Sequence, residues 1–324
     1  MTEATSPPPP SRPGATIFTI EGRTAPGLFV LGWLATIVGL GPTVIGYLVG
    51  QVLLFFVGLA ILSVGLVAGA GAQAIERRAK GVEAYQGPSP ILVFAASIPV
   101  GILAAIVIGF FFRSAGMRTE GPAGDLLLLT IQAAAYLVIV RLLVVGTGAL
   151  SWHEMGFTRS IPTALEDLGW GAVFAGPVIV ATLVVQVILV AIFQVTPESP
   201  LTPTGEPIGL LANLVTAAIV APIGEEIVFR GVATTAWVRS LGVRQGIIRA
   251  ALFFAIAHIL TTSATNASAG LAMAIVGFGA RVPVALVLGW VFVRRGSIYA
   301  SIGLHAAFNG ILIVLAGAAL RSSS

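Results

Sequence analysis

The segment GEEIVFRG, residues 224–231, places Glu225 and Glu226 side by side directly after a long apolar run. A carboxylate at membrane depth costs about 2.5–3.5 kcal/mol on insertion scales, so two of them together indicate a function. Glu226 and Arg230 are four residues apart and share one face of a helix. We therefore predict that Arg230 is a bidentate partner that keeps Glu226 ionised. Glu225 points elsewhere, has no local cation and is a candidate general base.

Two later apolar segments carry further polar residues at helical spacing. The stretch FFAIAH places Phe254 four residues before His258, and HAAFN places His305 four residues before Asn309. Polar groups within a membrane tend to face the interior of a bundle and to pair with one another. The two histidines, the asparagine and the carboxylate pair are therefore predicted to form one shared site.

These residue types suit two kinds of chemistry. Glu225 with one of the two histidines can polarise a water molecule, while the other histidine and the Asn309 amide can donate hydrogen bonds to a developing oxyanion. Alternatively, Glu225, His258 and His305 form a common catalytic zinc set, so the cofactor is either zinc or none. A purely structural ion-pair cluster at the headgroup level is the remaining interpretation.

Other catalytic motifs are incomplete. His153 and Glu154 begin a metalloprotease helix motif, but Phe157 stands where its second histidine would be, so we expect His153 in a cytoplasmic loop or interfacial helix. The chain has no cysteine, which excludes disulfides, thiolate nucleophiles and cysteine-ligated metals.

Composition defines the class of protein. The chain is 57% hydrophobic and 9% charged, with a mean hydropathy of +1.01, whereas soluble domains average about 25% charged residues. An all-α, polytopic transmembrane helix bundle of about 8–9 spans is predicted. The net charge of +4 suits a lipid bilayer with anionic headgroups, and nothing indicates a nucleic-acid partner. Sixteen of the 17 basic residues are arginine and alanine, glycine and valine are abundant, which favours a bacterial source and a bacterial cell membrane.

The chain divides into a tail and two groups of apolar segments. Residues 1–26 are rich in proline and are predicted to form a disordered cytoplasmic tail. Residues 27–164 are predicted to be an N-terminal group of transmembrane helices, and residues 165–320 the domain that carries the site. The predicted spans are 27–48, 52–74, 90–112, 125–146, 168–193, 208–229, 246–262, 271–293 and 297–319.

The distribution of basic residues predicts the orientation. With a cytoplasmic N-terminus, the inside loops hold most of the positive charge, as the positive-inside rule requires. The inside residues are Arg77, Arg78, Lys80, Arg159, Arg239, Arg244, Arg294 and Arg295. The outside residues are Arg113, Arg118 and the C-terminal Arg321.

The three motifs together resemble a known family. EEIVFRG, FFAIAH and HAAFN are similar, in the same order, to the E-E-x-x-x-R, F-x-x-x-H and H-x-x-x-N motifs of the CPBP family of intramembrane proteases. That family includes CAAX prenyl protease 2 and the Abi or Rce1-like proteins. The resemblance covers roughly residues 165–320.

The resemblance implies an intramembrane endopeptidase that acts on membrane-associated or leader-bearing polypeptides. It implies that Glu225 activates water with help from His258, and that Glu226 and Arg230 support the helix and its charge. It also implies that His305 and Asn309 stabilise the oxyanion. Two rival hypotheses are a non-catalytic membrane scaffold or immunity-type protein, and a proton-coupled transporter in which Glu225 is a relay.

Overall fold

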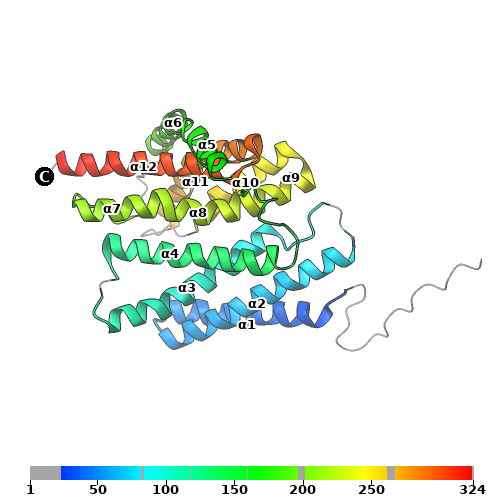
Figure 1. Ribbon diagram of the computed structural model, residues 1–324. Helices are drawn as coiled ribbons and strands as arrows, with labels where there is room; N and C mark the ends of the chain where they lie inside the picture. The colour runs from blue at the N-terminus through cyan, green and yellow to red at the C-terminus, as the bar shows by residue number, and fades with distance from the viewer. Residues whose placement is uncertain are drawn as a thin grey trace, which may run out of the picture.

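The computed structural model describes residues 23–81, 84–117, 119–158, 160–195, 201–260 and 267–322, and the regular elements among these residues are all helices (Figure 1). Its elements are α1 (Pro26–Leu48), α2 (Val52–Ala79), α3 (Pro90–Ser114), α4 (Gly121–Val140), η1 (Arg141–Val145), α5 (Ile161–Ala172), α6 (Ala175–Phe193), α7 (Pro207–Val215), η2 (Thr216–Val220), α8 (Ala221–Glu226), η3 (Ile227–Thr234), α9 (Thr235–Leu241), α10 (Val243–Ala257), α11 (Ala267–Arg295) and α12 (Ile298–Ser322), where η marks a π-helical turn. Most of the predicted tail, together with Arg118 and Arg159, lies outside the described residues.

The predicted class, an all-α polytopic bundle, is confirmed. Eight helical stretches within the described residues are long and apolar enough to cross a membrane. The segment predicted at 246–262 differs, because α10 has only 15 residues and is about 22 Å long, against a hydrocarbon core of about 30 Å. Gly242, with a φ of 81°, separates α10 from α9, and the helix ends before His258.

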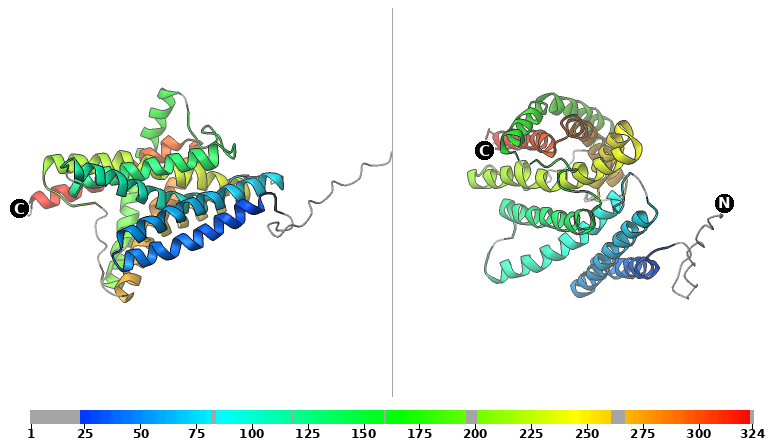
Figure 2. Two further views of the ribbon diagram at one scale, coloured as in Figure 1. Left: turned by 90° about the horizontal axis from the view of Figure 1, so that it is seen from below. Right: turned by 45° about the vertical axis from the view of Figure 1, so that its right-hand side comes forward.

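The first two helices form a closely packed antiparallel pair at one edge of the molecule (Figure 2). Gly32, Gly39 and Gly46 recur every seven residues and are buried on one face of α1. A Cβ on Gly32 would lie 2.6 Å from the backbone nitrogen of Gly69 on α2. Small residues let two helix backbones approach this closely, and van der Waals contact then holds a pair for which lipid provides no hydrophobic driving force.

Helices α3 and α4 connect this pair to the central stretch α7–η2–α8–η3–α9. An aromatic cluster marks the junction. The ring centroid of Phe94 on α3 lies 5.6 Å from that of Phe229 on η3 and 5.4 Å from that of Phe253 on α10. The Phe229 and Phe253 centroids are 5.2 Å apart. The N-terminal helices therefore pack directly against the elements that carry the candidate site.

Helices α5, α6, α11 and α12 form the other side of the molecule (Figure 1). Within this side, the backbones of α5 and α12 approach each other most closely where the two helices cross. A Cβ on Gly303 of α12 would lie 2.7 Å from the carbonyl carbon of Leu168 on α5. Only glycine permits this approach, which fixes the position of α12 next to the site.

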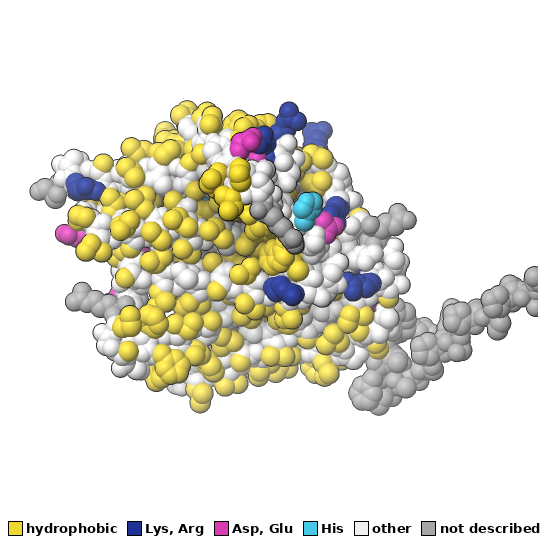
Figure 3. All heavy atoms as spheres, in the orientation of Figure 1, with side chains coloured by type: hydrophobic (Ala, Val, Ile, Leu, Met, Phe, Trp, Pro, Cys, Tyr) yellow, Lys and Arg dark blue, Asp and Glu magenta, His cyan; other side chains and the backbone are white. Residues whose placement is uncertain are grey.

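The surface agrees with a membrane location. Hydrophobic side chains cover most of the face in Figure 3, and charged side chains form a few small groups, most of them to the right of the centre. Large apolar side chains such as Leu31, Ile37 and Leu53 are more than half exposed. The chain is a multi-pass membrane protein.

Candidate active site

The central stretch, residues 207–241, has two widened turns that shape the site. In η2 the Ala221 N–H donates to the Thr216 carbonyl five residues earlier, as in a π-helix. The next carbonyl in this pattern, that of Ala217, would accept from residue 222, which is a proline without an N–H. The carbonyl of Ala217 therefore lacks a donor from its own helix.

Asn309 supplies the missing donor from α12. Its Nδ2 donates a hydrogen bond to the Ala217 carbonyl over 2.9 Å. A buried carbonyl without a partner is costly, so this contact stabilises the bend before the two glutamates. The sequence prediction assigned Asn309 to the oxyanion. The second hydrogen of Nδ2 is still available for that role, since an amide nitrogen has two.

The second widened turn, η3, follows Glu226 directly. The Thr234 hydroxyl donates to the Phe229 carbonyl over 2.8 Å, and the Thr235 hydroxyl donates to that of Arg230 over 3.3 Å. Each bond joins residues five apart and satisfies a carbonyl of the widened turn. Single π-turns inside α-helices occur frequently at functional sites.

The predicted ion pair between Glu226 and Arg230 is present. Arg230 Nη1 lies 3.0 Å from Glu226 Oε1, and both side chains are at most 1% exposed. The contact is single rather than bidentate as predicted, because Arg230 Nη2 donates instead to the Ala285 carbonyl of α11 over 3.3 Å. The guanidinium carbon also lies 4.6 Å from the centre of the Phe254 ring, which suits a cation–π contact.

His305 lies between the two glutamates. Its Nδ1 is 2.7 Å from Glu226 Oε1, and its Nε2 is 3.9 Å from Glu225 Oε2. A carboxylate accepts hydrogen bonds, so we place the proton on Nδ1, and Nε2 of the neutral ring is then an acceptor.

His258 is held in the same way. Its Nδ1 lies 2.8 Å from the Phe254 carbonyl, which can only accept, so Nδ1 carries the proton. The Phe254 ring packs 4.2 Å from the imidazole, measured between ring centres. The His258 Nε2 lies 3.4 Å from Glu225 Oε2. Phe254 thus contacts both the imidazole of His258 and the guanidinium of Arg230.

Three acceptor atoms therefore converge at Glu225, namely its own Oε2 and Nε2 of the two neutral histidines. Glu225 Oε2 is buried and has no hydrogen-bond partner among the described residues. Acceptors do not bond one another, so this arrangement needs a donor between them, and a water molecule with two O–H groups meets that need. Glu225 and His258 keep 19% and 25% of their side-chain surface, which lets a substrate reach them.

The donor types also suit zinc, but within the described ranges no group of three or more His, Cys, Asp or Glu side chains is arranged to hold a metal ion. The prediction of a zinc site gains no support from this geometry.

The structure brings together Glu225, Glu226, Arg230, His258 and His305, and it connects Asn309 to them through the Ala217 carbonyl. His153 is exposed in the loop before α5, where its neighbour Glu154 pairs with Arg239 at 2.9 Å. Sequence reasoning missed Pro222 and the carbonyls of Ala217 and Ala285. Of these, only the proline left a signal, as a residue three positions before Glu225.

Comparison with known proteins identifies the class. Residues 207–311 match the family model for type II CAAX prenyl endopeptidase Rce1-like proteins. All six candidate residues fall inside the match. The comparisons with curated proteins and with solved structures give no match. The matched segment begins at α7 and is narrower than the predicted domain, whose boundaries at 165 and 320 stay a prediction.

Proposed function

We propose that the chain is an intramembrane endopeptidase that hydrolyses peptide bonds of membrane-associated or leader-bearing polypeptides. One observation carries the proposal: the buried Oε2 of Glu225 lacks a hydrogen-bond partner among the described residues and faces Nε2 of both His258 and His305. A water molecule held there is next to a base. The family match supports a protease over a scaffold or a transporter.

In the proposed reaction Glu225 removes a proton from water, and the resulting hydroxide attacks the peptide carbonyl carbon. His258 orients the water, and the proton passes from Glu225 to the leaving amine as the C–N bond breaks. When the substrate carbonyl enters, Nε2 of His305 takes up a proton from solvent and donates a hydrogen bond to the oxyanion, while Glu226 stabilises the imidazolium through Nδ1. The ring returns this proton to solvent after product release. The second N–H of Asn309 donates to the same oxyanion.

Glu226 and Arg230 are given supporting roles. Both are buried, and neither reaches the open side of the site. Their charges compensate each other, and Glu226 also fixes the ring of His305. The orientation of His305 thus depends on an ion pair that does not touch the substrate.

The peptide termini of the membrane proteome test the proposal. We expect wild-type protein to generate new peptide ends that are absent with Glu225→Gln at matched abundance, because the amide keeps the shape but cannot act as a base. Glu120→Gln is the matched control, since this glutamate is exposed at the start of α4. Identical termini with Glu225→Gln and wild type would overturn the proposal and favour the scaffold.

The proposed mechanism uses no metal. We therefore expect cleavage by the purified protein to continue in the presence of a zinc chelator. Loss of cleavage that is restored by added zinc would instead assign Glu225, His258 and His305 as ligands.

The proposed setting is a bacterial cell membrane with a cytoplasmic N-terminus. The partners are a peptide or protein substrate and the lipid bilayer, with no nucleic acid. Ion-driven uptake into vesicles without any cleavage would favour the transporter hypothesis.

A further inference from the structure

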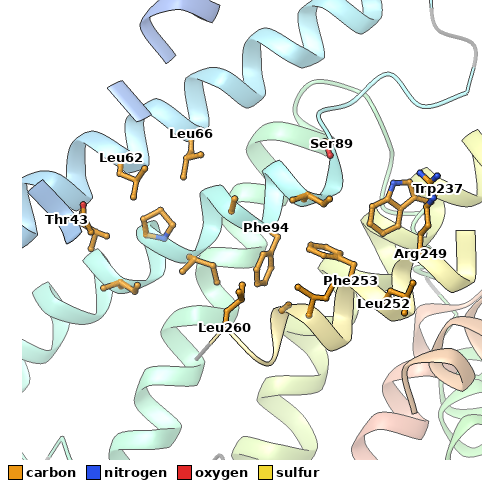
Figure 4. A pocket seen from close by; sticks show the side chains of 18 residues that line it. Thr43, Leu62, Leu66, Ser89, Phe94, Trp237, Arg249, Leu252, Phe253 and Leu260 are labelled. Carbon is orange, nitrogen blue, oxygen red and sulfur yellow. The ribbon is translucent and has the colours of Figure 1, made fainter. Parts of the chain in front are cut away.

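An apolar groove of about 840 Å³ lies between the N-terminal helices and α10 (Figure 4). One wall comes from α1, α2 and α3 and includes Leu62, Leu66 and Phe94. The other wall comes from α9 and α10 and the residues after it, including Leu252, Phe253 and Leu260. Only the second wall lies within residues 207–311, which match the Rce1-like family model, so the groove requires the N-terminal helices of this chain.

The groove is open to the membrane, and large apolar side chains are exposed along it. Ile91, Ile256 and Leu260 are 55%, 47% and 69% exposed. A transmembrane helix about 10 Å across and 30 Å long occupies on the order of 2,400 Å³, which is far more than the groove holds. A ligand of the size of lipid tails fits this volume.

One end of the groove is polar. Figure 4 shows Trp237 and Arg249 together at one end, with Ser89 toward the same side, while Thr43 and Leu62 lie at the opposite end. Tryptophan and arginine are typical of the level of lipid headgroups. Arg249 is exposed and has no ion-pair partner among the described residues.

We propose that this groove binds one anionic phospholipid of the surrounding bilayer, with its phosphate at Arg249 and its acyl chains along the apolar walls. The unpartnered cation provides the charge complementarity, since basic pockets between transmembrane helices recognise anionic headgroups. The groove also reaches Ala257 and Leu260, on either side of His258. A bound lipid therefore fills the space behind the segment that carries His258.

The test uses the full-length protein, purified in detergent and titrated with dioleoylphosphatidylglycerol or dioleoylphosphatidylcholine. Bound lipid is counted by native mass spectrometry. Arg249→Gln removes the proposed phosphate contact. Arg244→Gln is the matched control, because Arg244 is exposed on the same helix but does not line the groove. Ala95→Phe fills the groove from the α3 wall.

We expect wild-type protein and Arg244→Gln to retain one phosphatidylglycerol in preference to phosphatidylcholine. Arg249→Gln should bind it about fivefold more weakly, which corresponds to the ~1 kcal/mol that one basic residue contributes near an anionic surface. Ala95→Phe should bind neither lipid at this site.

Any one of these outcomes would overturn the proposal: equal retention by Arg249→Gln and Arg244→Gln, equal affinity for the two lipids, or unchanged binding in Ala95→Phe. Co-purification of a peptide in the groove in place of lipid would do the same. None of these readouts depends on peptide cleavage, so the lipid site stands or fails separately from the proposed function.

Discussion

At the scale of the residue, Arg230 is the side chain on which the buried half of the site depends. Replacement by alanine leaves Glu226 buried without its cation, and removing one partner of a buried pair costs about 3–5 kcal/mol. We expect Arg230→Ala to lower the free energy of unfolding in detergent micelles by this order.

The double variant provides the control for that measurement. Arg230→Ala combined with Glu226→Gln should regain part of the loss, because a neutral amide needs no cation. If Arg230→Ala unfolds like wild type, the ion pair contributes nothing to stability and its supporting role is wrong.

The ion pair between Glu226 and Arg230 could be predicted from the sequence, because residues four apart still lie on one face of the helix where η3 begins. The sequence could not predict that Glu226 Oε1 accepts from both Arg230 and His305, since that contact joins elements far apart along the chain. The sequence also could not predict that this contact is single rather than bidentate, because the second guanidinium nitrogen donates to the Ala285 carbonyl, which is distant along the chain.

At the scale of the element, Pro222 and Asn309 form a coupled pair across α8 and α12. Asn309→Ala should cost about 1–3 kcal/mol of unfolding free energy, because it leaves the Ala217 carbonyl without a donor. In a Pro222→Ala background the N–H of residue 222 can replace that donor. We expect the loss to shrink, with a coupling on the order of 1 kcal/mol in a double-mutant cycle.

Activity separates the two roles of Asn309. If the amide also stabilises the oxyanion, Asn309→Ala should remain slow at cleavage in the Pro222→Ala background although its stability recovers. Strictly additive stabilities would contradict the structural role.

The crossing of α5 and α12 gives a second prediction at this scale. Gly303→Ala should destabilise the protein by about 1–3 kcal/mol, because the new methyl group meets the backbone at Leu168. Gly310→Ala is the control on the same helix, since the atom nearest to its new methyl group, the Ala218 Cβ, lies 3.5 Å away, an ordinary van der Waals distance. Thermal unfolding that is the same for both variants would contradict the close crossing.

Hydrophobic length predicted most of these elements well. It failed for α10, because the apolar run continues past the residue where the helix ends. Length also could not reveal η2 and η3, since π-turns arise from hydrogen-bond partners rather than from hydropathy.

At the scale of the whole molecule, the distribution of charge predicts how the chain sits in the bilayer. Because the chain lacks cysteine, a single introduced cysteine shows on which side of the membrane its residue lies, with no other substitution needed. Lys80→Cys should react with a membrane-impermeant thiol reagent only after the cells are opened, and Met117→Cys should react in intact cells. Labelling of residue 80 in intact cells would contradict the predicted orientation and place the N-terminus outside the cell.

The glycine-lined contact of α1 with α2 also bears on how the protein assembles. Helix α1 has its close backbone neighbours on α2, which is the next helix in the chain. During synthesis these two segments enter the bilayer before α3 to α12, and the closest neighbour of each is the other. A paired hairpin would thus be in place before the glutamates leave the ribosome, ready as a template onto which the later helices dock.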